Sequence, residues 1–130
     1  MEIKAGLRGT STVVVAEEHT AARFGAGGVH VFGTPMMIGL MENAAFSAIQ
    51  PRLPEGQSSV GTRVNVSHLA ATPIGMRVTA TAELIEVDGR RLVFRVEARD
   101  EKELIGEGQH ERFIITLDRF LSRIDEKAKG

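Results

Sequence analysis

The second half of the chain alternates between apolar and polar residues over long stretches. Even-numbered positions from 76 to 84 are apolar and the odd ones between them are polar, and residues 91–99 largely repeat the pattern. A period of two is typical of a strand with one buried and one solvated face. Between the two stretches lies Asp88-Gly89, a strong hairpin signal because both central residues of such a turn need positive φ. The pattern predicts antiparallel strands over 76–87 and 91–99.

Three further strands are expected in the rest of the chain. A turn at residues 100–103 precedes a strand over about 104–117, in which Gly106 and Gly108 suggest a β-bulge. This strand completes a three-stranded meander. Residues 12–17 form a predicted first strand and residues 60–69 a second one. The face of the second strand that we assign to the core carries Val60, Val64, Val66 and His68.

One segment has the period of a helix. Thr34 is a suitable N-cap, Pro35 suits the first helical position, and the segment ends near Gln50-Pro51. Apolar residues recur at helical spacing at Met37, Met41, Ala44, Ala45 and Ala48. The segment is apolar or small on nearly every side, and helices of this kind are normally buried. We therefore expect a central, buried helix about 24 Å long.

These elements predict an α+β fold in which a curved antiparallel sheet wraps around one helix. The 130 residues suit one domain, which we expect to span residues 1–130. Within it, residues 118–130 are a charged tail, expected to form a short surface helix because apolar residues recur at nearly helical spacing near its start. A single curled sheet leaves at least one open edge, which a second copy of the chain would cover while completing a ligand site.

The composition excludes several kinds of functional site. The chain has no cysteine and no tyrosine, which excludes a disulfide, a thiolate zinc site, a cysteine nucleophile and a tyrosine general acid. Its 16 basic and 17 acidic residues provide no bulk positive field for nucleic acid. No apolar run approaches the length of about 18 residues that spans a membrane, and no targeting segment is evident. We expect a cytoplasmic protein that binds neither nucleic acid nor membrane.

Glu42 is the first candidate for chemistry. Between Arg23 and Arg52 the chain contains no other Asp, Glu, Lys or Arg. The residues one helical turn away from Glu42 offer a carboxylate no partner, and burying an unpaired carboxylate costs several kcal/mol. Either the side chain reaches a solvated edge of the helix, or it is kept in an apolar cleft as a base or nucleophile.

His68 and Thr34 are the other two candidates. His68 is either an ordinary core histidine or an acid/base group that works near neutral pH. The sheet face that carries it also faces the helix with Glu42, so these two side chains can meet. Thr34 either caps the helix or, together with the free N–H groups of the helix N-terminus, helps to hold an oxyanion.

The remaining polar residues fit plainer roles. Residues 25–28 do not complete a phosphate-binding glycine pattern and are interpreted as a flexible loop. The four histidines show no metal-ligand spacing, so no metal is expected. We expect His110, Glu111 and Arg112, on the last strand, to take part in surface pairing.

Three segments match one known group of proteins. They are residues 34–42 (TPMMIGLME), 61–73 (GTRVNVSHLAATP) and 106–112 (GEGQHER). Together they resemble the hot-dog-fold acyl-CoA thioesterases, specifically the fluoroacetyl-CoA thioesterase-like group, and the match extends over about residues 18–120. The resemblance implies hot-dog subunits assembled as a homodimer or a dimer of dimers, with active sites near the dimer interface.

The resemblance also implies a substrate and residue roles. The substrate would be an acyl-CoA thioester, and coenzyme A would be present only as part of it, with no separate cofactor. Thr34 would position the reacting groups and polarise the thioester, Glu42 would attack the carbonyl or activate water, and His68 would be the acid/base partner. The expected substrate contacts are Phe32, Pro35 and Gly61.

One segment departs from the fluoroacetyl-specific type. That type has a longer, aromatic-bearing lid before the helix, whereas residues 24–32 here are short and glycine-rich, with Gly28 and Val29 at the place of the lid aromatic. We therefore expect hydrolysis of a small or medium acyl-CoA rather than fluoroacetyl selectivity. The alternative is a non-catalytic acyl-CoA binding module on the same fold. A hot-dog enoyl-CoA hydratase is disfavoured, because those enzymes pair Asp and His within one short motif.

Overall fold

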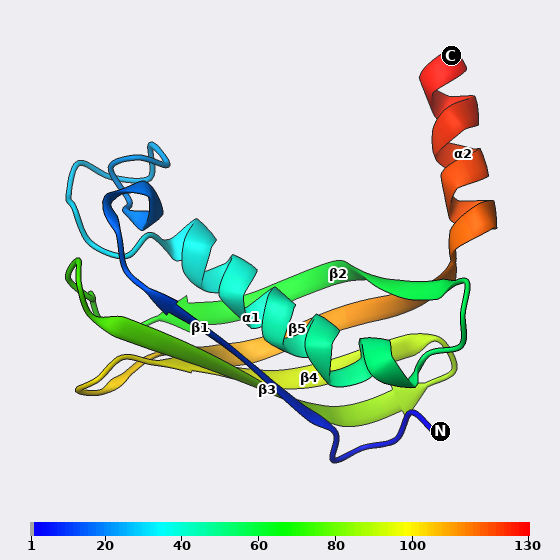
Figure 1. The fold of residues 1–130 in the computed structure, drawn as a ribbon, viewed down its shortest axis with the longest axis horizontal. Coiled ribbons are helices and arrows are strands. Elements are labelled where there is room, and N and C mark those ends of the chain that lie inside the picture. The colour runs from blue at the N-terminus through cyan, green and yellow to red at the C-terminus, as the bar shows by residue number, and fades with distance from the viewer. Residues whose placement is uncertain (1) are drawn as a thin grey trace.

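The computed structural model describes residues 2–130 as a five-stranded antiparallel sheet curled around one long helix, with a second helix at the C-terminus (Figure 1). In chain order the elements are β1 (Arg8–Val14), η1 (Glu17–His19), α1 (Thr34–Ile49), η2 (Gln50–Arg52), β2 (Gln57–His68), β3 (Arg77–Asp88), β4 (Arg91–Arg99), β5 (Leu104–Thr116) and α2 (Leu117–Lys129). The strand order β1-β3-β4-β5-β2 places β1 and β2 at the two edges of the sheet.

The predicted meander is present as β3, β4 and β5. Asp88 pairs with Arg91, so the two turn residues are Gly89 and Arg90, and only Gly89 has a positive φ, of +61°. The predicted hairpin is present, but its turn lies one residue later than Asp88-Gly89 and places glycine first. The predicted irregularity in β5 lies beside Gly106, because Ala98 pairs with Gly106 whereas Arg99 pairs with Leu104. Gly108, by contrast, pairs in regular register, so the predicted bulge does not extend to it.

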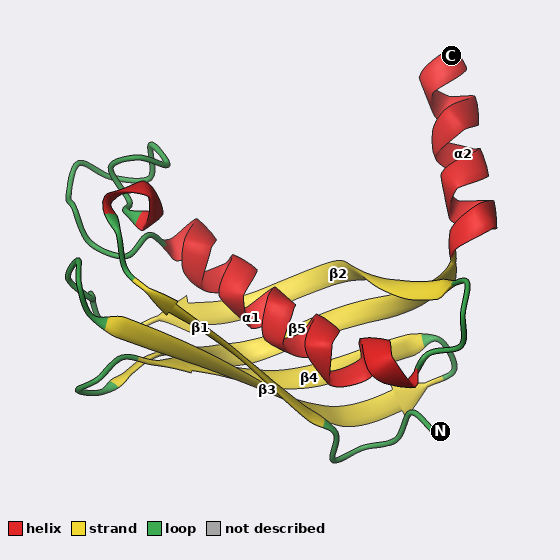
Figure 2. Cartoon of the chain, viewed as in Figure 1, coloured by secondary structure: helices red, strands yellow, loops and turns green. Residues whose placement is uncertain are grey.

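The concave face of the sheet holds α1, as Figure 2 shows. One side of this helix forms the centre of the core, with the buried residues Met37, Leu40, Met41, Ala44, Ala45, Ala48 and Ile49. β1 crosses the helix so closely that a Cβ at Gly9 would collide with the backbone of Ala44 and Ala48. The expectation of a helix buried on every side is wrong for a single chain, because Pro35, Gly39, Asn43 and Ser47 form an exposed row.

The two edge strands differ from the predicted ones. β1 begins and ends three to four residues earlier than expected, because its register against β3 runs from Arg8–Glu83 to Val14–Arg77. β2 contains a register shift between Gly61 and Arg63, opposite Arg112 and Glu111 of β5. At this irregular edge Val64 is 39% exposed, so its predicted place in the core is wrong. Val66 does pack against the core.

The charged tail forms α2, as expected, but the helix stands away from the sheet (Figure 1). It continues directly from β5 and rises past β2, the strand at that edge of the sheet. Its apolar residues Leu117, Leu121 and Ile124 are exposed. In residues 2–130, no helix has both the length and the apolar character needed to cross a membrane.

Candidate active site

The first residue of α1 and the last residue of β2 meet at one end of the molecule. Thr34 Oγ1 lies 2.7 Å from His68 Nδ1, within hydrogen-bonding distance. Two of the three candidate residues are therefore brought together from positions 34 residues apart in sequence. The contact forms because β2 runs back along α1 and ends beside its N-terminus (Figure 1).

The N-cap of α1 is Gly33 rather than Thr34, so the predicted cap is wrong by one residue. The amides of Met36 and Met37 donate to the Gly33 carbonyl, and Pro35 has no N–H. Of the first-turn amides in the described structure, only that of Thr34 has no hydrogen-bond acceptor. Thr34 thus offers both a hydroxyl and a free amide at the positive end of the helix dipole.

His68 has the properties of a neutral base at physiological pH. Burial lowers its pKa below the ordinary value of 6.5, and the backbone of Ala70 exerts a smaller opposing effect. Its Nε2 atom is buried and has no hydrogen-bond partner in the described structure. Because buried polar atoms are normally paired, this nitrogen is suited to a substrate or water group.

A cavity of about 320 Å³ opens beside the Thr34–His68 pair. Its walls are mostly apolar, and they come from the segment before α1 and from the end of β2 with the residues that follow it. The lining residues are Ala21, Val31, Phe32, Thr34, His68, Leu69, Ala70 and Ala71. Of the expected substrate contacts, Phe32 lines this cavity, whereas Pro35 and Gly61 do not.

Glu42 lies further along α1, beside two basic side chains of β5. Its Oε2 atom is 3.6 Å from Arg112 Nη1 and 4.0 Å from His110 Nε2. The Glu42 side chain is 41% exposed, whereas those of Arg112 and His110 are 7% and 1% exposed. The carboxylate therefore sits at a solvated edge of the helix, as one of the two interpretations expected, and a buried cation approaches it from the sheet.

Arg112 is held rigidly in that position. Its Nε donates to Ser59 Oγ at 2.8 Å, and its Nη2 donates to the Ser59 carbonyl at 2.9 Å. Nη1 is 3.2 Å from His110 Nε2, while His110 Nδ1 is 2.8 Å from the Arg63 carbonyl. Burial lowers the pKa of both basic groups. These partners assign the neutral tautomer with its proton on Nδ1 to His110, so that Arg112 can donate to Nε2.

The expectation of surface pairing on β5 is wrong for His110 and Arg112 and right for Glu111. Glu111 points outward and accepts a hydrogen bond from Arg91 Nε at 3.0 Å. The signal that the sequence analysis missed was parity, because His110 and Arg112 alternate in step with the core residue Ile114. Side chains with the same parity on a regular strand share a face.

Gly61 lies against the Glu42 carboxylate. A Cβ added there would collide with Glu42 Oε2, and it would lie 3.1 Å from His110 Cε1 and 3.5 Å from Arg112 Nη1. The absence of a side chain at Gly61 therefore makes room for the Glu42 carboxylate.

The substitution Gly61→Ala is expected to displace the Glu42 carboxylate and to lower kcat about a hundred-fold, a loss typical of a displacement of about 1 Å. Thermal unfolding should change little, because the half-exposed glutamate can move toward solvent. Steady-state hydrolysis of an acyl-CoA checks this. Gly28→Ala is the matched control, since a Cβ at Gly28 meets nothing within 4 Å. An unchanged kcat in Gly61→Ala would contradict the role assigned to the glycine.

Within one chain, the three candidates form two groups. Thr34 and His68 are in contact, whereas Glu42 is eight residues further along α1, a rise of about 12 Å. The predicted meeting of Glu42 with His68 is not seen as a direct contact in the described structure. No cluster of three or more His, Cys, Asp or Glu residues suited to a metal ion occurs in the described part of the chain.

Comparison with known proteins identifies the family. The model of the family described as fluoroacetyl-CoA-specific thioesterase matches residues 15–118. The chain belongs to this family. A fluoroacetyl-CoA thioesterase from Streptantibioticus cattleyicolor is 50% identical over 97 residues, which cover 75% of this chain and 70% of that protein.

Solved structures agree with this assignment. The fluoroacetyl-CoA thioesterase FlK is 41% identical with a TM-score of 0.90, covering 98% of each chain. A single-residue variant of FlK, in complex with fluoroacetate and CoA, is 44% identical with a TM-score of 0.85, covering 91% of this chain and 99% of the other. A hot-dog-like protein from Thermanaerovibrio acidaminovorans is 27% identical with a TM-score of 0.88, covering 97% and 93%. The predictions of an α+β hot-dog fold and an acyl-CoA thioesterase are confirmed.

Proposed function

We propose that the protein hydrolyses a small or medium acyl-CoA with Thr34, Glu42 and His68 as its catalytic residues. The observation that carries the proposal is the Thr34–His68 contact at the wall of an apolar cavity, where His68 Nε2 has no partner in the described structure. The complex of the FlK variant with fluoroacetate and CoA supports a CoA thioester as the substrate.

The proposed reaction begins with the thioester carbonyl near the N-terminus of α1. The free amide of Thr34 and the helix dipole stabilise the negative charge that develops on the carbonyl oxygen. Glu42 supplies the electrons in one of two ways. If it attacks the carbonyl carbon, the carbon–sulfur bond breaks and an anhydride between Glu42 and the acyl group forms, which a water molecule then opens while neutral His68 takes the water proton. If it activates water, Glu42 takes the water proton, and the carbon–sulfur bond breaks as the tetrahedral intermediate collapses. In both routes CoA leaves as a thiolate and receives the proton taken from water, so that Glu42 and His68 return to their starting forms.

We further propose that the working unit is a homodimer formed through β2. This strand is an edge of the sheet in one chain, and its central residues 61–65 are all exposed. An exposed strand edge readily pairs with a second copy. The same contact would cover the exposed row on α1 and bring a second set of site residues close to Glu42. Because acyl-CoA pools are intracellular, we place the protein in the cytoplasm.

A panel of acyl-CoA thioesters with a colorimetric thiol readout tests this function. We expect the highest kcat/KM for short or medium unbranched acyl groups, because residues 24–32 contribute no large lid to the cavity. Saturable binding of acyl-CoA without thiol release would instead support the non-catalytic binding module. A mass by light scattering equal to one chain at micromolar concentration would contradict the dimer.

A further inference from the structure

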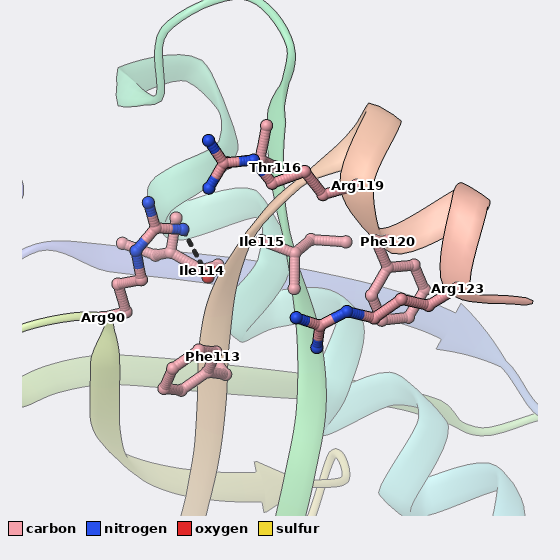
Figure 3. Close-up of a pocket in the computed structure, with 8 residues that line it drawn as sticks. All are labelled: Arg90, Phe113, Ile114, Ile115, Thr116, Arg119, Phe120 and Arg123. Carbon is pink, nitrogen blue, oxygen red and sulfur yellow. Dashed lines mark hydrogen bonds between the residues drawn. The ribbon is translucent and has the colours of Figure 1, made fainter.

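A second cavity, rich in arginine, lies where α2 leaves the sheet (Figure 3). It has a volume of about 200 Å³ and is formed by the turn before β4, the end of β5 and the first two turns of α2. The residues that line it are Arg90, Phe113, Ile114, Ile115, Thr116, Arg119, Phe120 and Arg123. It is separate from the cavity beside His68 and has no place in the proposed reaction.

The three arginines of this cavity form no ion pair in the part of the chain that the structure describes. In residues 2–130, no carboxylate lies within 4.0 Å of Arg90, Arg119 or Arg123. Arg90 donates one hydrogen bond, to the Ile114 carbonyl at 3.3 Å, which fixes its direction. Arg119 and Arg123 are one helical turn apart, so their like charges repel each other.

Acidic residues are present on α2, but they lie beside the cavity rather than in it. Asp118 and Glu126 line the neighbouring face of α2 together with Ser122, and Arg119 and Arg123 border this face as well. The cavity itself combines guanidinium groups with the two phenyl rings of Phe113 and Phe120. Arginine binds phosphate through paired N–H groups, and aromatic side chains stack on nucleobases. The walls thus fit a phosphorylated ligand that carries a flat aromatic base.

We propose that this cavity binds the phosphorylated adenosine end of coenzyme A while the acyl end occupies the active site of the partner subunit. The proposal rests on the function and the dimer proposed above. It assigns to α2 a role in recognising the substrate, and it predicts that each active site is completed by the other chain.

The sheet separates the arginine cavity from the active-site residues of its own chain. Arg112 and Phe113 are adjacent on β5, so their side chains point to opposite faces, and Arg112 points toward Glu42. Phe113 pairs with Val60, and His68 is eight residues further along β2, about 26 Å away. A substrate bound beside Phe113 would therefore have to pass around the edge strand β2 to reach Glu42 of the same chain.

Antiparallel pairing of two β2 strands removes this separation. If the pairing is centred on the exposed run 61–65, the partner's His68 lies opposite Ser58, and the partner's Leu69 lies opposite Gln57. Leu117, the first residue of α2, donates a hydrogen bond to the carbonyl of Gly56 at 2.9 Å. The root of α2 is thereby fixed beside the mouth of the partner's cavity.

The direction of α2 agrees with this placement. Figure 1 shows the helix rising past β2, beyond the edge at which the second chain would be added. Its 13 residues span about 20 Å, several times the spacing of neighbouring strands. In Figure 3 the side chains of Arg119 and Arg123 reach back from α2 toward β5. A substrate that enters past Leu69 would leave its nucleotide end outside the strand ends, where these arginines lie.

The double variant Arg119→Ala/Arg123→Ala tests the proposal with two substrates. We expect KM for acetyl-CoA to rise about ten-fold or more, since charge-assisted hydrogen bonds to phosphate are lost. KM for acetyl-pantetheine, which lacks the nucleotide, should not change. Lys127→Ala/Lys129→Ala removes the same charge from the end of α2 and should leave both KM values unchanged. An unchanged KM for acetyl-CoA, or equal rises for both substrates, would overturn the proposal.

A binding measurement without any thioester tests the arginine cavity independently of the proposed hydrolysis. Adenosine 3′,5′-bisphosphate should bind the wild type in calorimetry and bind the double arginine variant at least ten-fold more weakly, whether or not any thioester is hydrolysed. Inorganic phosphate is the second probe. Equal affinity for phosphate and for the bisphosphate would identify a simple phosphate site and overturn the assignment to coenzyme A.

Mixed dimers test whether the arginine cavity of one chain binds the nucleotide end of a substrate that reacts in the active site of the other chain. One subunit carries His68→Ala with intact arginines, and the other carries Arg119→Ala/Arg123→Ala with intact His68, with a different affinity tag on each. The one competent histidine, and with it the one working cavity, then lies in the subunit without arginines. A wild-type KM for acetyl-CoA would show that the arginines of one chain bind the substrate of the other. A KM raised as in the arginine variant would contradict this.

Discussion

Replacing Glu42 by glutamine is expected to lower kcat for acyl-CoA hydrolysis about a thousand-fold while the protein stays folded. A neutral amide can neither attack the thioester carbonyl nor take a proton from water, and losses of this order are typical when a general base or nucleophile is removed. Glutamine keeps the size of the side chain. Losing the counter-charge of the buried Arg112 should lower the free energy of unfolding, but Arg112 keeps its hydrogen bonds to Ser59 and its contact with His110, so the chain should stay folded.

The measurement is steady-state thiol release together with thermal unfolding of the same samples. Glu107→Gln, an exposed glutamate on β5, is the matched control and should keep wild-type kcat. Full activity in Glu42→Gln would contradict the proposed mechanism. An acyl group found by mass spectrometry on the Glu42 peptide after an acid quench would support direct attack rather than activation of water.

Much of the fold could be predicted because its signals are local. The alternation in residues 76–84 and the Asp-Gly turn describe neighbours in sequence, and β3 and β4 follow them closely. The helix bounds were also accessible, since Pro35 and Pro51 stand at its two ends. The pairing of β2 with β5 and the irregularity at Gly61 join residues far apart in sequence, and no local pattern contains them.

The site was predicted in part for the same reason. The shared face of Val66 and His68 follows from strand parity, which brings His68 to the helix and to Thr34. Parity also applies to Arg112, but a charged residue near a strand end was assigned to the surface. Arg112 is buried because Ser59 and His110 satisfy its N–H groups and Glu42 lies at 3.6 Å, a set of partners that only the folded sheet assembles.

The spacing of the site residues also bears on assembly. In one chain Thr34 and His68 form one group and Glu42 with Arg112 another, about 12 Å apart along α1. A single carbonyl carbon cannot reach two groups this far apart in one chain. Both groups lie beside the free edge β2, because His68 is its last residue and Glu42 lies against Gly61. The catalytic proposal and the dimer proposal therefore depend on the same surface of the molecule.

Replacing His68 by alanine is expected to lower kcat/KM about a hundred-fold or more and to remove the acid limb of its pH profile. Burial lowers the pKa of His68, so in the wild type the base form is lost only as the pH falls below 6.5. The wild-type kcat/KM should thus stay level down to about that pH and fall below it. Thr34→Val, which removes the hydroxyl 2.7 Å from Nδ1, should lower kcat/KM with the acid limb retained.

The same lowered pKa predicts a change in stability. Because the unfolded chain takes up the proton more readily than folded His68, the stability contribution is present above pH 6.5 and is lost as the pH falls through the lowered value. His110, whose pKa burial also lowers, adds a change of the same sign, so the comparison must be between the wild type and His68→Ala. An acid limb that persists unchanged in His68→Ala would assign that proton to another group.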